Sequence, residues 1–266
     1  GPKTVAELER LRDLSVILPK PAIPPQFGPH PAPSFAEQKR IVEAARENAL
    51  TYIRSLPDFI CTEAVRRYDN TRGKLIDTLT LKLTYFGQKE NYQLLAINGR
   101  STSLPYEAVG GVITQGEFGS LLSEVFEPKS GAEFQWDHWT TLRKRPAQVY
   151  AFRVAAGRSH YRLDAVGRSR RYSAAVGQHG LVYVDRDTAR TLRIVAEADN
   201  IPSDFPVESA VTTLDYDFSD IGGRQFLLPL RADVRMRTPG LETRNEVEFN
   251  SYKKFTSDAT ITFDPH

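Results

Sequence analysis

Strict two-residue alternation near the C-terminal end is the feature that most constrains the fold of this 266-residue chain. Between residues 226 and 237, apolar side chains share one parity and charged side chains share the other. The apolar set is Phe226, Leu228, Leu230, Ala232, Val234 and Met236, and the charged set is Arg231, Asp233, Arg235 and Arg237. Because successive side chains of a strand point to opposite faces, the pattern predicts an antiparallel strand with one apolar and one wet face.

The same alternation recurs along the chain after Pro57. The apolar positions are Leu79, Leu81, Leu83 and Tyr85, then Tyr150, Phe152 and Val154, then Val247 and Phe249, followed by Ile261 and Phe263. The pattern predicts about ten antiparallel strands, which is many for a flat open sheet. We therefore expect a strongly curved antiparallel β-sheet, a half-barrel.

A helical period precedes the strands. Ser34 and Glu37 form a capping box, the reciprocal N-terminal cap of a helix. Apolar residues follow at helical spacing, at Ile41, Ala45, Ala49, Tyr52, Ile53 and Leu56, and Pro57 ends the run. This predicts an amphipathic helix of about five to six turns, whose apolar stripe needs a partner surface. The sheet is the expected partner, so the fold class is α+β.

The N-terminal segment has a different composition. Thr4 and Glu7 form another capping box and predict a short helix. Seven of the 17 prolines then fall between Pro19 and Pro33, which predicts an extended strap. We therefore expect two parts, residues 1–33 with the helix and strap, and residues 34–266 with the half-barrel and its long helix. Gly1-Pro2 resembles the scar of a removed tag, so a native signal peptide is expected to precede this sequence.

A short apolar stretch interrupts the strands. Glu117–Phe126 carries Phe118, Leu121, Leu122, Val125 and Phe126 at helical spacing, and Pro128 ends it. Such a helix is expected to pack into the concave side of the sheet. It either lines a ligand site there or fills the concavity.

The two tryptophans, Trp136 and Trp139, are an odd number of residues apart. On a strand this spacing predicts that they point to opposite faces. The simpler interpretation is that both pack against neighbouring elements. The alternative is that one of them lines a concave ligand surface together with Phe118, Leu122 and Phe126.

Composition and motifs exclude several function classes. A net charge of +2 gives no general attraction to nucleic acid, and no apolar run approaches the ~20 residues of a membrane helix. The histidines form no zinc motif, and the single Cys61 excludes a classical zinc site. The run Asp215–Gly223 begins like a calcium loop but has Asp220 where glycine is required, so it reads better as a strand. We expect no metal and no cofactor.

No catalytic residue is predicted either. The chain has no GxSxG elbow, no CxxC and no phosphate-binding glycine loop. A hydrolase with an unrecognised site stays a third hypothesis, with His138 and His160 as the plausible general bases.

The stretch GLVYVDRDTARTLRIV, residues 180–195, holds Asp185 and Asp187 between two alternating apolar runs. Asp and Thr side chains bond nearby backbone N–H groups, so both carboxylates are interpreted as parts of a hairpin turn. A site for an ion or for acid–base chemistry is the alternative.

Two resemblances add to this pattern. GLVYVD, the turn RDTARTLRI and TLDYDFSDIGGRQFLLPLRADVRM, within residues 180–236, resemble the LolA/LolB/RseB-like group of bacterial envelope proteins. That resemblance implies a half-barrel wrapped around helices, with an apolar concave face, in proteins that carry lipoproteins or sense envelope components without catalytic residues. Over residues 44–263 the chain also resembles a family of uncharacterised, predicted exported proteins of soil bacteria, which supports a periplasmic or otherwise exported location.

The leading hypothesis is therefore a non-enzymatic envelope protein that binds a lipid or an acylated partner, such as a lipoprotein, on its concave face. The alternative is an envelope scaffold with a filled barrel, which would bind a protein partner through a sheet edge or the proline strap.

Overall fold

In the computed structural model, the described residues are 31–87, 89–110, 119–166 and 171–255. Contacts divide the chain into two compact units, Gly1–Ala32 and Pro33–His266, and the second unit carries all the described helices and strands. The predicted first helix, most of the proline-rich segment, and the positions Phe118, Ile261 and Phe263 lie outside the described residues. The predicted boundary after Pro33 stays a prediction.

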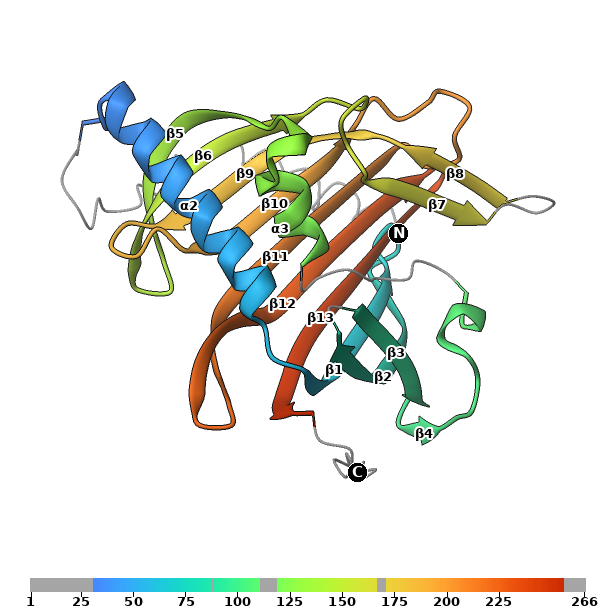
Figure 1. Cartoon of the computed structure of the whole chain (residues 1–266). Coiled ribbons are helices and arrows are strands. Elements are labelled where there is room, and N and C mark those ends of the chain that lie inside the picture. Colours follow the sequence, from blue (N-terminus) through green and yellow to red (C-terminus); the bar gives the residue numbers. More distant parts are fainter. Residues whose placement is uncertain (1–30, 88, 111–118, 167–170, 256–266) are drawn as a thin grey trace, which may run out of the picture. The chain divides into compact units, whose positions relative to one another are not determined.

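One open antiparallel sheet of eleven strands dominates this unit (Figure 1). Its strands are β1 (Phe59–Asp69), β2 (Lys74–Phe86), β3 (Lys89–Ile97), β4 (Arg100–Ser101), β5 (Glu133–Leu142), β6 (Arg145–Val154), β9 (Gly177–Asp185), β10 (Thr191–Asp199), β11 (Ser209–Ile221), β12 (Arg224–Thr238) and β13 (Leu241–Lys254). The spatial order is β4-β3-β2-β1-β13-β12-β11-β10-β9-β6-β5. Because β1 pairs with β13, the first and last of the described strands meet inside the sheet and leave β4 and β5 as its edges.

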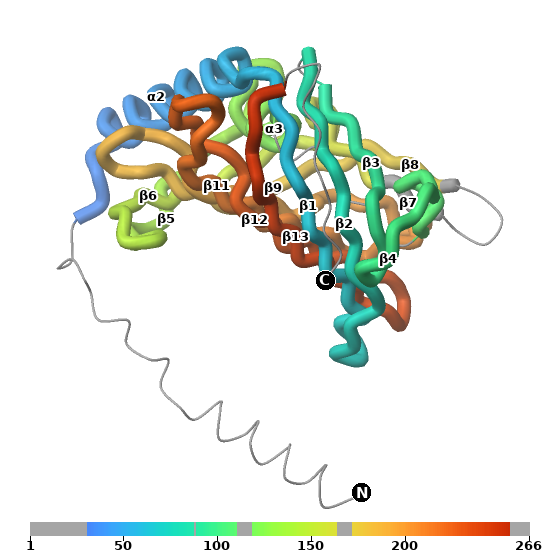
Figure 2. The backbone as a smooth tube through the Cα atoms, turned by 90° about the horizontal axis from the view of Figure 1, so that it is seen from below, coloured from blue at the N-terminus to red at the C-terminus, as the bar shows by residue number. Residues whose placement is uncertain are grey.

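The sheet is strongly curved, and two helices lie on its concave side: α2 (Phe35–Ser55) and α3 (Ser120–Phe126). Figure 2 shows both helices on the same side of the bent sheet. The predicted α+β half-barrel is confirmed. Short 3₁₀ turns, η1 (Tyr106–Ala108) and η2 (Pro128–Ser130), and a separate two-stranded hairpin, β7 (Arg162–Val166) with β8 (Arg171–Ala175), complete the described elements. None of the helices within the described ranges combines the length and apolarity needed to cross a membrane.

The long helix α2 forms as its capping box predicts. Oγ of Ser34 accepts a hydrogen bond from the backbone N–H of Glu37 at 3.3 Å. The helix ends at Ser55, two residues before Pro57, because the residue before a proline disfavours helical backbone. Its stripe of Ile41, Ala45 and Ala49 is buried against the sheet core, which confirms the predicted packing.

The buried core of the sheet follows the predicted two-residue alternation of apolar and polar side chains. Leu79, Leu81, Leu83 and Tyr85 of β2 are all buried, and the residues between them are half-exposed. The same holds for Val247 and Phe249 of β13. These side chains and the helical stripe form one hydrophobic cluster, so the apolar concave face is covered by α2 and α3.

The predicted apolar face of β12 is wrong at one position. Leu230 is 36% exposed, although it shares parity with the buried Leu228 and Ala232. The register between β11 and β12 shifts here, because Arg231 pairs with Asp215 while Pro229 pairs with Tyr216. This β-bulge leaves Leu230 as the extra residue and turns it toward solvent.

Candidate functional site

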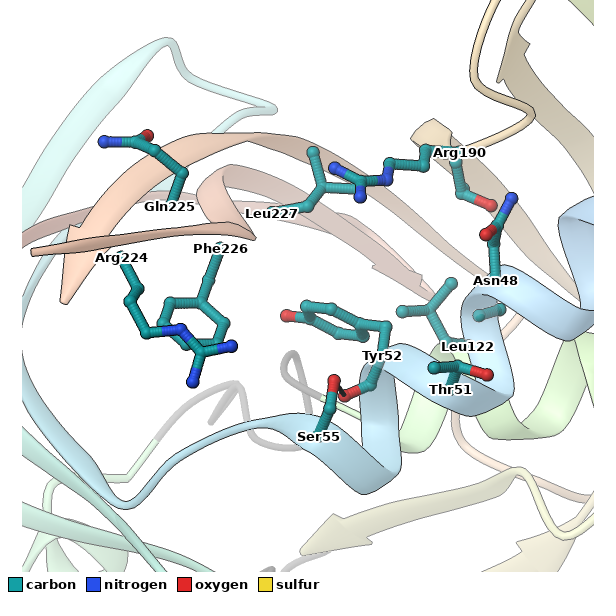
Figure 3. Close-up of a pocket in the computed structure, with 12 residues that line it drawn as sticks. Asn48, Thr51, Tyr52, Ser55, Leu122, Arg190, Arg224, Gln225, Phe226 and Leu227 are labelled. Carbon is teal, nitrogen blue, oxygen red and sulfur yellow. Dashed lines mark hydrogen bonds between the residues drawn. The ribbon is translucent and has the colours of Figure 1, made fainter.

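A pocket of about 220 Å³ lies between the C-terminal half of α2 and the nearby ends of β10 and β12 (Figure 3). Its apolar surface comes from Tyr52 of α2, Leu122 of α3 and two residues at the start of β12, Phe226 and Leu227. The Tyr52 ring packs edge-on against Tyr216 of β11, with ring centroids 6.5 Å apart. Residues from distant parts of the sequence therefore build one recess on the concave side, in which these apolar side chains lie beside polar ones such as Asn48, Thr51 and Gln225.

Two hydroxyl groups in this pocket are buried without a partner. Within the described part of the chain, neither Oη of Tyr52 nor Oγ1 of Thr191 has a hydrogen-bond partner. Burial, and after it the neighbouring Tyr216, raise the pKa of Tyr52 well above its ordinary value, so its hydroxyl keeps its proton and can donate. An unsatisfied buried hydroxyl costs about 1–3 kcal/mol, which a polar atom of a ligand or a water would recover.

Two arginines also line the pocket. The guanidinium carbon of Arg190 lies 5.2 Å from the centre of the Phe218 ring, and that of Arg224 lies 5.6 Å from the centre of the Phe226 ring. Each guanidinium therefore stacks over an aromatic face while its N–H edge stays open to other partners.

The hairpin turn after β9 positions Arg190. Oδ1 of Asp185 accepts the backbone N–H groups of Asp187 and Thr188 at 3.1 and 2.8 Å, and the backbone N–H of Asp185 donates to the carbonyl of Arg190 at 2.8 Å. Asp187 is exposed and pairs with Arg186. The turn prediction for Asp185 is confirmed, and the turn places Arg190 and Thr191 beside the pocket.

Helix α2 is tied to the same turn by one side chain. Nδ2 of Asn48 donates to the carbonyl oxygens of Thr188 and Ala189, at 3.0 and 3.1 Å. These two bonds link the helical wall of the pocket to the turn that carries Arg190.

A tight turn positions Arg224 in the same way. Gly222 and Gly223 both have positive φ, 62° and 81°, which the two-residue turn between β11 and β12 requires. Oδ1 of Asp220 accepts the backbone N–H of Gly223 at 3.0 Å. The strand interpretation of Asp215–Gly223 is confirmed up to Ile221, and no group of possible metal ligands occurs among the described residues.

Asp215 joins the strands beneath the pocket, on the face of the sheet that points away from it. This buried carboxylate lies between the core residues Leu214 and Tyr216 and accepts hydrogen bonds from Arg193 of β10, at 2.6 and 2.8 Å, and from Arg231 of β12, at 2.8 Å. Arg143 adds an ion pair at 3.2 Å. Burial raises the pKa of Asp215, but the bonds from Arg193 and Arg231 and the nearby charges outweigh burial and leave that pKa below its ordinary value.

The predicted site residues do not come together at one place. Leu122 lines the pocket, whereas Phe126 is buried in the core and stacks on Phe134 of β5, with centroids 5.7 Å apart. Phe118 lies outside the described residues. A ligand role for these residues therefore stays a prediction.

The predicted opposite orientation of the tryptophans is wrong. The rings of Trp136 and Trp139 touch, with centroids 5.1 Å apart, and Trp136 also packs edge-on against the buried Tyr150. The register between β5 and β6 shifts between Trp136 and His138. The bulge at Asp137 changes the parity of the strand and brings both indoles to the same side.

Neither candidate general base lines the pocket. His138 contacts the neighbouring Asp137, and Nδ1 of His160 lies 3.6 Å from Oε1 of Glu124, but both histidine side chains are about half exposed or more. This arrangement gives the hydrolase hypothesis no enclosed site at either histidine.

Of the residues that line the pocket, sequence reasoning predicted only Leu122 as a site residue, and it missed the polar and charged ones that bear on a ligand: Tyr52, Arg190, Thr191 and Arg224. Helical spacing places Tyr52 in the apolar stripe of the helix, although a buried tyrosine hydroxyl ordinarily finds a partner. Only the glycine pair before Arg224 gives a local signal, since it predicts a tight turn at that point.

Comparison with solved structures finds several similar chains of low sequence identity, among them the following three. A LolA superfamily protein from Nitrosomonas europaea is 13% identical over 82% of this chain and 93% of that chain, with a TM-score of 0.41. A DUF1329 family protein from Desulfovibrio piger is 11% identical over 82% and 95%, with a TM-score of 0.41. A putative outer membrane lipoprotein-sorting protein domain from Vibrio parahaemolyticus is 12% identical over 84% and 94%, with a TM-score of 0.46. No family model and no curated protein matches the chain.

Proposed function

We propose that this protein is a non-enzymatic, periplasmic or otherwise exported envelope protein that binds a lipid or the acyl chain of a partner on its concave face. The observation that carries the proposal is the recess between α2 and the sheet, which Leu122, Phe226 and Leu227 line. Tyr52 and Thr191 line it too, and the buried hydroxyls of both have no partner in the described chain. Small-ligand sites combine apolar side chains with polar groups that fix the orientation of the ligand, and this recess offers both.

The size of the pocket limits what it accepts. About 220 Å³ is below the roughly 300–1,000 Å³ of sites for drug-sized ligands. Each buried CH₂ contributes about 0.8 kcal/mol, so even a short piece of one acyl chain gains useful affinity. The pocket therefore suits one chain end rather than a whole diacyl lipid. Phe118, Phe126, Trp136 and Trp139 remain candidates for contacts beyond it.

Displacement of a fluorescent fatty acid from the purified protein tests the proposal. Leu122→Phe places a larger side chain into the recess and should weaken probe binding at least tenfold. Leu104→Phe, at an exposed position that does not line the recess, is the matched control and should bind as the wild type does. Unchanged binding by a folded Leu122→Phe variant, or no lipid in mass spectra of organic extracts and no probe binding, would contradict the proposal.

A second candidate is an envelope scaffold that acts through a sheet edge. It rests on β5, a ten-residue edge strand that pairs only with β6 among the described strands. Exposed edges accept partner strands, and a lysine there blocks such pairing. Thr140→Lys and deletion of residues 18–33 should then abolish association with an envelope protein while leaving fatty-acid binding unchanged.

A further inference from the structure

The pocket has a charge asymmetry that its apolar surface does not require. Arg190 and Arg224 line it, and no aspartate or glutamate is among its lining residues. In Figure 3 the Tyr52 ring lies between these two arginines. A recess with two cations and no carboxylate among its lining residues has a positive potential, which solvent and salt moderate because both arginines are exposed.

Both guanidinium groups are available to a ligand. Within the described ranges, neither Arg190 nor Arg224 forms an ion pair or a side-chain hydrogen bond. Two arginines elsewhere in the sheet give the contrast, because each pairs with a carboxylate: Arg67 binds Asp77 at 2.6 Å and Arg193 binds Asp215 at 2.6 Å. The two pocket arginines are thus stacked and oriented by aromatic rings without being neutralised.

The buried hydroxyls supply a second, independent sign of a polar ligand group. Oη of Tyr52 is buried, aimed into the recess, and without a partner in the described chain. Thr191 also lines the recess, and its buried Oγ1 has no partner among the described residues. Because burial raises its pKa, Tyr52 stays protonated and offers a donor rather than a third charge to the ligand. Donors and cations in one recess recognise an acceptor that carries negative charge.

We propose that the pocket selects a single-chain amphiphile with an anionic head, bound by Arg190 and Arg224, whose adjoining chain packs on Tyr52, Leu122 and Phe226. This inference rests on the proposed function and adds its ligand class. A guanidinium matches carboxylate and phosphate oxygens bidentately. A free anion would leave the apolar surface wet, and a neutral amphiphile would leave both cations unpaired, so the combination favours an anionic head with a chain.

Three probes of equal chain length test the selection: dodecanoate, dodecanol and dodecyltrimethylammonium, in competition with a fluorescent fatty acid. The two charged probes are kept below their micellar concentrations, and dodecanol is kept below its solubility limit. We expect dodecanoate to bind about tenfold or more tightly than dodecanol, and the cation to bind least. The preference for dodecanoate should shrink as salt rises, because the ion pairs at the pocket mouth are screened. Acetate alone should not compete.

The double variant Arg190→Gln/Arg224→Gln should lose the preference for dodecanoate about tenfold and keep its affinity for dodecanol. Arg100→Gln, at an exposed arginine that does not line the pocket, removes a charge of the same kind and should behave like the wild type. The single variants Arg190→Gln and Arg224→Gln separate the two contributions if the double variant fails to fold.

The outcomes distinguish failure of the anionic selection from failure of the proposed lipid-binding function. If dodecanoate and dodecanol bind equally, or if the double variant keeps the full preference, the anionic selection is wrong and the lipid-binding function stands. If none of the three amphiphiles binds, the lipid-binding function itself fails, and the inference fails with it.

Discussion

The concave face has two regions that differ in how their polar atoms are satisfied. In the sealed region, formed by Phe126, Phe134, Trp136 and Tyr150, rings pack on rings, and the Tyr150 hydroxyl donates to Oε1 of Gln148 at 2.8 Å. In the pocket, the hydroxyl of Tyr52 is equally buried but has no partner in the described chain. One apolar sheet face is thus closed by packed rings at one place and opens into a pocket at another, where the hydroxyls of Tyr52 and Thr191 have no partner in the described chain.

The largest effect is expected where the sealed region is emptied. Phe126 is 1% exposed, so Phe126→Ala should lower the free energy of unfolding by about 3–5 kcal/mol, through lost burial and a new cavity. Phe35→Ala, at an 82% exposed position, is the control and should change it by less than about 0.5 kcal/mol. Urea unfolding measures both. A small loss for Phe126→Ala would mean that this region is not tightly packed.

A somewhat smaller effect is expected from Asp215, whose carboxylate binds arginines beneath the pocket. Asp215→Asn should cost about 3 kcal/mol, because three arginines lose the buried carboxylate that joins β10, β11 and β12. Hydrogen exchange should rise in these strands more than in β5 and β6. An equal increase of hydrogen exchange in β5 and β6 would contradict a local role for Asp215.

The same carboxylate predicts a pH dependence. The pKa of Asp215 is lower in the folded protein than in the unfolded chain, so the unfolded state binds the proton more tightly. Its contribution to stability is therefore complete above the unfolded pKa, near 4, and is lost as the pH falls through the folded value. Unfolding free energies measured from pH 6 to pH 2 should fall less steeply for Asp215→Asn than for the wild type.

One substitution made in both regions gives the sharpest comparison. Tyr150→Phe removes the hydrogen bond to Gln148 and leaves the buried Oε1 of Gln148 without that donor. It should therefore lower the free energy of unfolding by about 1–2 kcal/mol. Tyr52→Phe removes an unpartnered hydroxyl and should leave stability unchanged or raise it by up to about 1 kcal/mol. It should also weaken dodecanoate binding. Equal losses in the two variants would show that the hydroxyls do not distinguish the regions.

The smallest effect is expected at the link between α2 and the hairpin turn. Asn48→Ala removes two hydrogen bonds to the carbonyls of Thr188 and Ala189 and should cost about 1 kcal/mol. Amide exchange in residues 186–190 should increase, and probe binding should weaken because Arg190 is less well positioned. Lys39→Ala, at an exposed position of the same helix that does not line the pocket, is the comparison variant.

The parts of the fold that could be predicted are those set by local pattern. The capping box at Ser34, the alternation in β2 and the turn at Asp185 each depend on residues a few positions apart. The predictions for Leu230 and the two tryptophans are wrong because a bulge inserts one residue and reverses parity, and nothing in the local sequence marks it. The pocket could not be predicted, because it needs residues 48–55, 190–191 and 224–227 to meet, and only the tertiary fold sets that meeting.

The bulge at Asp137 also gives the protein an optical signature. Trp136 and Trp139 are the chain's only tryptophans, and their rings lie 5.1 Å apart at 67°. Indole transitions at this separation couple, and the coupling depends on the distance and angle between the rings. The circular dichroism of the coupled bands therefore reports the state of the β5–β6 hairpin, not of the chain as a whole. During unfolding, the loss of that signal marks the moment when this edge of the sheet opens.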